Sequence, residues 1–231
     1  MNVSDVYLML TLNGVSFSYG RKKIIEDLSF SVAQGECVVL AGPNGSGKST
    51  ALSIIAGVLK PSRGTVDVKG KLGYVPQGSA LLEDATVKEN LKFFASVTHG
   101  QIPEKLPFSV EKHLKKKVSR LSGGMSKQVS IACALLGDPN IILLDEPCAA
   151  LDISFRDEMI KLVCSWKEEG KAIVYVGHDP AEFYPFYDKL VLPGISRTVL
   201  TRGVDDAEAD TEEKFVRFYK EYILTYPQGD N

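Results

Sequence analysis

The sequence has no long hydrophobic run and no basic leader segment. The longest stretch without a charged residue, Val6 to Gly20, is too short to cross a membrane and contains Asn13 and Gly14. Asp5 stands where a signal peptide would carry positive charge, so a secretory leader is not expected. We therefore expect a chain that does not itself enter the membrane.

Cysteine is scarce, and neither sign of charge dominates. The four cysteines lack the spacing of a metal site or a disulfide framework, which predicts reduced thiols: Cys37, Cys133, Cys148 and Cys164. The formal net charge of −2 at pH 7 gives no reason to expect nucleic acid as a partner. What is present is apolar content, since 44% of the 231 residues are hydrophobic, enough for a real core. Without a long linker or an internal repeat, one domain over residues 1–231 is expected.

The pattern of apolar runs predicts an α/β fold. Residues 6–40 are expected to form several strands, with a turn at Gly20-Arg21. The segment from Gly64 to Val75 is predicted to be a hairpin that turns around Lys69-Gly70-Lys71. From Ile141 onward, apolar strands alternate with helices, which is the pattern of a parallel sheet.

Helices are expected in the middle and at the end of the chain. Thr86 and Glu89 form a capping box at the start of one helix. Residues 211–226 carry apolar side chains at helical spacing, which predicts an amphipathic helix packed on its own domain or, alternatively, against a partner. A basic run is interpreted as a solvated helix face: Lys112, Lys115, Lys116, Lys117 and Arg120.

The most informative segment contains the phosphate-loop motif G-x-x-x-x-G-K-[ST]. Its glycines let backbone N–H groups turn toward a β- and a γ-phosphate, Lys48 adds a positive charge, and the Ser49 hydroxyl can reach Mg²⁺. An apolar strand precedes it and a helical segment follows, so the N-terminal end of the helix dipole adds positive charge. The motif predicts a nucleoside triphosphate site, formed by Gly42, Pro43, Asn44, Gly45, Ser46, Gly47, Lys48, Ser49 and Thr50.

Two carboxylates follow the apolar strand Ile141 to Leu144. Asp145 is expected at the carboxyl edge of the sheet, where α/β folds bind their ligands, and can there serve Mg²⁺. Glu146 can polarise a water for attack on the γ-phosphate. A strand end capped by solvated acids is the alternative, but together with the phosphate loop the pair favours catalysis.

A third motif, Leu121-Ser122-Gly123-Gly124-Met125, precedes a helical stretch. Ser122 and the two glycines offer a hydroxyl and backbone N–H groups at a helix N-terminus, which is a second potential anion site. By itself a Ser-Gly-Gly turn more often only marks the start of a helix. Its occurrence in a chain with a phosphate loop gives the functional interpretation more weight.

Together these motifs resemble those of the ATP-binding cassette, or ABC, family of ATPases. Leu121 to Gly124 resembles the signature loop, Gln77 the Q-loop, Asp152 the D-loop and His178 the switch histidine. Tyr19 resembles the aromatic residue that stacks on adenine, although an aromatic ring also suits a half-buried strand. The motifs occur in the family's order.

The resemblance implies a fold and a set of cofactors. The fold is a P-loop NTPase of the ABC type: a mostly parallel core sheet, an N-terminal antiparallel β-subdomain and an inserted helical subdomain at residues 78–137. The cofactors are ATP and Mg²⁺, with Ser49, Gln77 and Asp145 at the metal. Hydrolysis is implied for Glu146, with Gln77 and His178 assisting.

The resemblance also implies partners. Two ABC protomers form a homodimer or heterodimer in which the phosphate loop of one and the signature loop of the other enclose each ATP. Ser122, Gly123, Gly124 and Asp152 are then nucleotide-binding residues across the dimer. A separate transmembrane permease would hold the chain at the cytoplasmic face of the cell membrane.

Departures from the family pattern bear on the function. Met125 replaces the commoner glutamine, as it often does in bacterial exporters of drugs and polysaccharides, so export is favoured; Cys148-Ala149-Ala150 replaces a commoner Thr-Ser-Gly. Gln77 and Leu121 are 121 − 77 = 44 residues apart, too few for the coiled coil of chromosome-maintenance ATPases. A transporter subunit is therefore the leading hypothesis. A soluble ABC ATPase acting on DNA or ribosomes, and a slowly hydrolysing regulatory nucleotide binder, are the alternatives.

Overall fold

The computed structural model describes residues 7–149, 153–193, 197–202 and 210–225. Its elements, in chain order, are β1 Leu8–Tyr19, β2 Lys22–Ala33, β3 Cys37–Leu40, α1 Lys48–Ile55, β4 Arg63–Val68, β5 Leu72–Val75, α2 Val87–Thr98, η1 Pro107–His113, η2 Val118–Arg120, α3 Gly123–Ala134, β6 Ile141–Asp145, α4 Ile153–Glu168, β7 Ala172–Val176, α5 Pro180–Phe183, β8 Lys189–Leu192, β9 Arg197–Thr201 and α7 Glu212–Thr225. Within these ranges, no helix is long and apolar enough to span a membrane.

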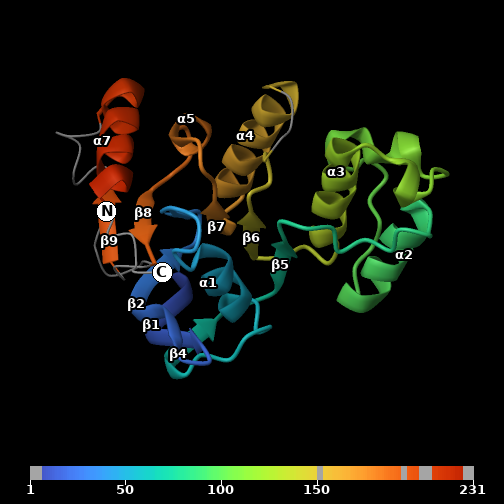
Figure 1. Cartoon of the computed structure of the whole chain (residues 1–231). Helices are drawn as coiled ribbons and strands as arrows, with labels where there is room; N and C mark the ends of the chain where they lie inside the picture. The colour runs from blue at the N-terminus through green and yellow to red at the C-terminus, as the bar shows by residue number, and fades with distance from the viewer. Residues whose placement is uncertain (1–6, 150–152, 194–196, 203–209, 226–231) are drawn as a thin grey trace.

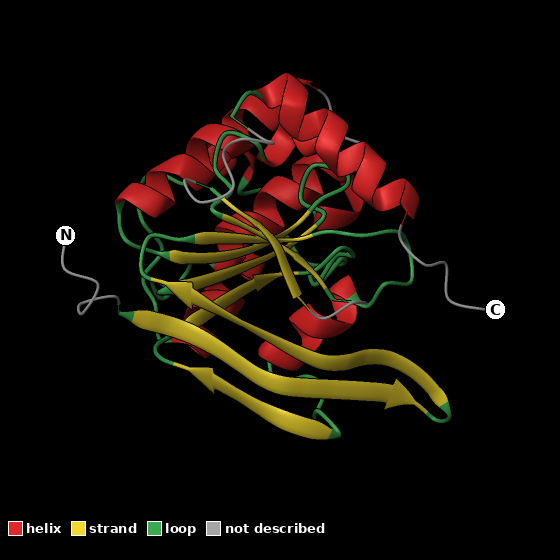
Figure 2. Ribbon diagram, turned by 90° about the vertical axis from the view of Figure 1, so that its left-hand side faces the viewer, coloured by secondary structure: helices red, strands yellow, loops and turns green. Residues whose placement is uncertain are grey.

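Two sheets form the centre of the molecule. The larger has six strands in the order β5-β6-β7-β3-β8-β9, parallel except for β9, and the smaller has three antiparallel strands in the order β2-β1-β4. Figure 2 shows the long antiparallel strands below the six-stranded sheet, with most helices on its other face. The predicted α/β fold, with a parallel core and an antiparallel N-terminal sheet, is confirmed.

Alternating side chains of the parallel strands face two different cores. Val38 and Leu40 of β3 pack with α1 and the three-stranded sheet, whereas Cys37 and Val39 pack with α4, α5 and α7. Because successive strand residues point to opposite faces, a strand buried on both faces is apolar throughout. The same alternation in β6 and β7 holds the sheet between its two layers.

The helical segments between β5 and β6 form a separate lobe. Figure 1 shows α2 and α3 side by side at one end of the molecule, with α7 at the opposite end. The lobe has its own apolar core, which includes Leu91 of α2 and Val129 of α3. The predicted capping box is present, since the Thr86 side chain accepts from the Glu89 backbone while the Glu89 carboxylate accepts from the Thr86 backbone.

The hairpin predicted from Gly64 to Val75 is wrong. β4 pairs with β1 in the small sheet, whereas β5 pairs in parallel with β6 in the large one. Gly70, with φ 119°, turns the chain between them, and the Asn140 side chain then accepts from the Lys71 N–H at 3.1 Å. β5 is half-buried to buried along its length, so it gains more apolar contact beside β6 than on an exposed hairpin.

The basic run from Lys112 to Arg120 is exposed, as predicted, but it is not one helix. It crosses the end of η1, a turn and η2. The Lys116 carbonyl accepts from the Val87 N–H at 2.9 Å, and the Val118 N–H donates to the Ala85 carbonyl at 3.0 Å. These bonds to the start of α2 use backbone groups that a continuous helix would need for its own ladder.

Candidate nucleotide-binding site

The phosphate loop connects β3 to α1, as its sequence context predicts. Gly42, Gly45 and Gly47 have φ of 127°, 83° and 91°, values that side-chain-bearing residues rarely adopt. A Cβ atom on Gly47 would lie 2.9 Å from Cγ1 of Ile25 and 3.1 Å from the carbonyl oxygen of Ile24. The loop therefore follows a path that needs glycine both for its dihedral angles and for its closeness to β2.

Lys48 is buried at the first position of α1. Its ammonium donates to the carbonyls of Gly42 and Pro43, each at 2.9 Å, so the side chain folds back along the loop. Burial lowers the pKa of Lys48, while the carboxylates of Glu146 and Asp145 act in the opposite direction. The positive charge is thus fixed next to the backbone that a phosphate group would approach.

Asp145 ends β6 and faces the start of α1. The Ser49 hydroxyl lies 3.2 Å from Oδ1 of Asp145, although the two residues are far apart in sequence. Burial raises the pKa of Asp145, and the hydrogen bond from Ser49 partly opposes that rise. A carboxylate and a hydroxyl in contact form the oxygen-rich donor pair that Mg²⁺ prefers, so these residues fit such an ion.

Glu146 connects two further predicted residues. Its Oε2 accepts from the Gln77 side-chain amide at 2.9 Å, and its Oε1 lies 2.6 Å from Nε2 of His178. The Glu146 backbone has φ 48°, an uncommon value for a residue with a side chain, and its N–H donates to the Val176 carbonyl at 3.0 Å. Its side chain is 13% exposed, against 45% for His178. The carboxylate is therefore held between an amide and an imidazole.

Several of these residues line a hollow of about 370 Å³ at the carboxyl edge of the large sheet. Its lining residues come from the phosphate loop, α1, the Q-loop, β2 and the position after β6: Ile24, Asn44, Gly45, Gly47, Lys48, Ser49, Thr50, Gln77 and Glu146. Ile24 was not predicted, because nothing in its sequence context distinguishes it from other strand residues. The structure thus brings the phosphate loop, the Q-loop glutamine and Glu146 to one place.

Other predicted residues lie apart from this hollow. Ser122 and Gly123 are exposed at the start of α3, where the Ser122 hydroxyl accepts from the Met125 N–H at 3.2 Å. Tyr19, at the end of β1, is 55% exposed, with its ring 4.9 Å from that of Phe17. Asp152 lies outside the described residues.

Two residues that the sequence did not single out contact the site. The Lys127 ammonium of α3 donates to the carbonyls of Pro76 and Gln77, each at 2.9 Å. Burial raises the pKa of Tyr219 in α7 to about 12, although a hydrogen bond from the Gly42 backbone acts the other way. The acceptor carbonyls lie 51 and 50 residues before Lys127 in the chain, so no local signal in the sequence marks this lysine. Tyr219 lies on the apolar stripe of α7, whose spacing gives no contact partner.

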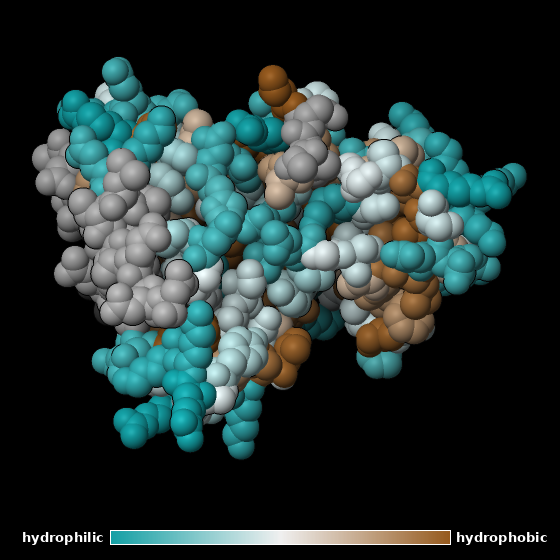
Figure 3. Space-filling model, in the orientation of Figure 1, coloured by the Kyte–Doolittle hydropathy of each residue, from teal (hydrophilic) through white to brown (hydrophobic). Residues whose placement is uncertain are grey.

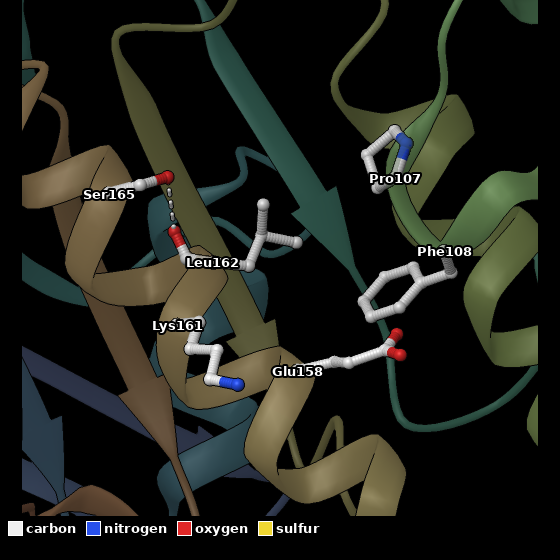
Figure 4. A pocket seen from close by; sticks show the side chains of 6 residues that line it. All are labelled: Pro107, Phe108, Glu158, Lys161, Leu162 and Ser165. Atoms are coloured by element: carbon white, nitrogen blue, oxygen red, sulfur yellow. Dashed lines mark hydrogen bonds between the residues drawn. The ribbon is translucent and has the colours of Figure 1, made fainter.

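A second hollow, of about 330 Å³, lies between the helical lobe and α4 (Figure 4). Pro107 and Phe108 line it from the lobe, and Glu158, Lys161, Leu162 and Ser165 line it from α4. The Phe108 ring stacks on Phe155 with centroids 5.0 Å apart. The two parts of the molecule therefore touch through aromatic rings beside this hollow.

Comparison with known proteins identifies the family. The model of the "ABC transporter" family matches residues 25–149, which include the phosphate loop, the signature loop and both carboxylates. This chain belongs to the ABC transporter family. Its ATP-binding domain accounts for the site described above, and the family generally hydrolyses ATP.

Curated relatives of this ABC protein carry transporter names. It is 36% identical over 210 residues to "Nod factor export ATP-binding protein I" of Bradyrhizobium diazoefficiens, covering 82% of this chain and 68% of the relative. It is 33% identical over 190 residues to "Linearmycin resistance ATP-binding protein LnrL" of Bacillus subtilis, covering 74% and 61%. The alignment thus spans about two thirds of these relatives.

Solved structures agree on the fold. A structure titled "Structure of ATP binding subunit of ABC transporter" superposes with a TM-score of 0.80 at 25% identity, covering 94% of this chain and 99% of that one. Another, titled as the ADP conformation of an ATP-binding cassette, has a TM-score of 0.72 at 24% identity. The ABC ATPase fold implied by the sequence motifs is confirmed.

Proposed function

We propose that this chain binds and hydrolyses ATP as the ATPase subunit of an exporter, working with a separate membrane permease. The observation that carries the proposal is the hydrogen-bonded set Gln77, Glu146 and His178 beside the phosphate loop. A glutamate held between an amide and an imidazole, next to a buried lysine, is suited to polarise a water near phosphate.

In this proposal the phosphate loop binds the β- and γ-phosphates through its backbone N–H groups and through Lys48. Ser49, Asp145 and Gln77 supply the oxygen ligands for Mg²⁺, which when bound neutralises phosphate charge. Tyr19 is exposed at the rim of the small sheet, where its ring is available to stack on the adenine base.

Hydrolysis needs a water in line with the bond between the γ-phosphorus and the bridging oxygen. Glu146 accepts a proton from this water as the water oxygen bonds to phosphorus; the bridging bond breaks, and ADP and phosphate result. Gln77 and His178 hold the two Glu146 oxygens at 2.9 and 2.6 Å, and so fix the direction of the carboxylate. The Lys48 charge stabilises the negative charge of the transition state.

A second protomer completes the site in this proposal. Ser122 and Gly123 are exposed at the start of α3, and neither they nor Gly124 line the hollow of their own chain. Exposed N–H groups at the start of a helix bind anions, so a facing protomer's ATP is a suitable ligand. Asp152 is assigned to this dimer contact, and closure around two ATP molecules followed by reopening would drive transport.

The export direction and the permease partner are supported from two sides. Met125 occupies the signature position at which exporters often carry methionine, and the relatives are named as an export and a resistance ATP-binding protein. Figure 3 shows brown, apolar surface on the lobe that carries α2. The exposed side chains there include Phe93 and Val97, at 47% and 62%. A permease segment covering them would remove apolar surface from water.

The experiment that tests the proposal is Glu146→Gln in the full chain. The amide retains the shape of the side chain but cannot take a proton, so ATP should still bind while the hydrolysis rate falls about 100-fold or more. Size-exclusion chromatography with Mg-ATP should then show a stable dimer. Glu104→Gln, at an exposed position, is the matched control. Unchanged hydrolysis would refute the catalytic assignment, and a monomer alone would refute the two-protomer mechanism.

The partner is tested by purifying the protein from membranes. A co-purifying multi-span protein without its own ATPase domain would support the permease. Recovery of ribosomes or DNA would refute the transport proposal and leave the nucleotide site unaffected.

A further inference from the structure

Lys127 lies between the signature loop and the catalytic carboxylate and belongs to neither motif. It occupies the second turn of α3, five residues after the capping residue Ser122. Its ammonium donates to the Pro76 and Gln77 carbonyls, each at 2.9 Å. These carbonyls belong to the segment that leaves β5 and carries the Gln77 side chain to Glu146. One side chain thus bonds the signature helix to the backbone of the Q-loop.

The position is unfavourable for a lysine without these contacts, because a charge withdrawn from water loses hydration. Lys127 is half-buried, and burial lowers its pKa, while Asp145 and Glu146 favour its charged form. The two carbonyls and the two carboxylates partly offset the desolvation of its charge. Its orientation is therefore set by the Q-loop and the sheet edge, and not by solvent.

Hydrogen bonds continue from Lys127 through the site. The Gln77 carbonyl accepts from Lys127, the Gln77 amide donates to Glu146 at 2.9 Å, and Glu146 contacts His178 at 2.6 Å. At the other end, Ser122 caps the same helix, about 7.5 Å along its axis from Lys127 at 1.5 Å per residue. A helix is stiff over this length, so a displacement of the signature loop moves the lysine with it.

We propose that Lys127 is a positioning residue that couples α3 to Gln77, so that engagement of the signature loop is transmitted to the Gln77 amide that contacts Glu146. The proposal rests on the function proposed above for Gln77 and Glu146. It assigns Lys127 no contact with ATP. Its effect is on how readily the bound nucleotide is hydrolysed once the signature loop is engaged.

The test compares Lys127→Met with the wild type, using the full chain. Methionine keeps most of the length and the apolar stem but removes the donors. We expect kcat for ATP hydrolysis to fall about 10-fold, while the Kd for ATP changes less than about 2-fold. Lys115→Met, at an exposed position of the same lobe, is the matched control and should leave both unchanged. An unchanged kcat, or a rise in Kd that accounts for the loss, would overturn the proposal.

A double-mutant cycle separates positioning from general stability. If Lys127 acts through Gln77, then Lys127→Met should reduce kcat little further in a Gln77→Ala background. An equal loss in both backgrounds would overturn the coupling. Should Lys127→Met not fold, Lys127→Gln, which keeps one donor group, takes its place in the same cycle. A Glu146→Gln chain that still hydrolyses ATP would instead show that the proposed function has failed, which keeps the two outcomes distinct.

Discussion

The two ligand-binding motifs of this chain differ in how complete they are within one protomer. At the sheet edge, the Ser49 hydroxyl is hydrogen-bonded to Asp145, and the Gln77 amide and the His178 ring are hydrogen-bonded to Glu146. At the signature loop, the Ser122 hydroxyl is hydrogen-bonded within its own helix, and Ser122 and Gly123 are exposed. The first motif is an assembled site, whereas the second presents donors outward.

This difference predicts which substitutions should lower nucleotide affinity and which should lower the rate of hydrolysis. An assembled site fixes its charges in advance, so it is expected to supply most of the binding free energy for the phosphates. Hydrogen-bond donors that face outward contribute to binding only when a second molecule brings an acceptor to them. We therefore expect substitution of the phosphate-binding Lys48 at the sheet edge to change ATP binding, and substitutions at the signature loop to change hydrolysis at constant affinity.

The largest expected effect is that of Lys48→Ala. It removes the buried charge of the site and its two bonds to the loop, so ATP affinity should fall about 100-fold or more. Isothermal titration calorimetry measures this directly. Lys60→Ala, at an exposed position after α1, is the control. Undiminished affinity would remove the contrast between the two motifs and refute the phosphate site.

A smaller and different effect is expected for Ser122→Asp. Aspartate also caps a helix, so α3 should form normally, but it places a negative charge where the partner's triphosphate would lie. The Kd for ATP should stay within about 2-fold, while kcat falls about 10-fold. Ser122→Asn keeps the cap without the charge and should lose less. If Ser122→Asp weakens binding as much as Lys48→Ala does, the signature loop serves its own chain's nucleotide.

The smallest expected effect is on the pH dependence of stability, through the buried Glu182 on α5. Burial raises the pKa of Glu182 on α5, whose side chain contacts Tyr175 and faces Cys148 and Arg156. The folded protein then holds this proton above the ordinary pKa of 4.5, so stability falls as pH rises from that value through the folded pKa. Glu182→Gln cannot titrate and should flatten this fall.

The contribution of Glu182 to stability is measured by thermal unfolding at several pH values from about 4.5 upward. Asp145 has a raised pKa as well, so the difference in Tm between the wild type and the variant is the informative quantity. Glu168→Gln, at an exposed position at the end of α4, is the control. Parallel Tm curves for wild type and Glu182→Gln would contradict the prediction.

Local patterns in the sequence predicted much of the fold. The phosphate loop between a strand and a helix, the capping box at Thr86 and the alternation of strands and helices after Ile141 depend on residues close together in the chain, and each is present. The predictions of a hairpin at Gly64 to Val75 and of one helix for the basic run were wrong for the same reason. In both places, backbone groups form hydrogen bonds to segments distant in the chain, and a local sequence pattern contains no information on such bonds.

The candidate site divides in the same way. Residue types and spacing identified Lys48, Asp145 and Glu146, because phosphate and metal chemistry need those groups at a strand or helix end. The family resemblance added Gln77 and His178, which are 69 and 32 residues from Glu146. Lys127, Ile24 and Tyr219 were missed, since their roles come from contacts between elements.

The sequence by itself therefore predicted the chemistry of the site, because a phosphate loop and a strand that ends in carboxylates are each defined by a few consecutive residues. The tertiary structure decided which groups meet. Parallel strands ending at one edge place Glu146 against Gln77 and His178, and the packing of α3 directs Lys127 to the Q-loop. Such pairings depend on strand order and helix packing, which are set by burial over the whole chain and by no single segment.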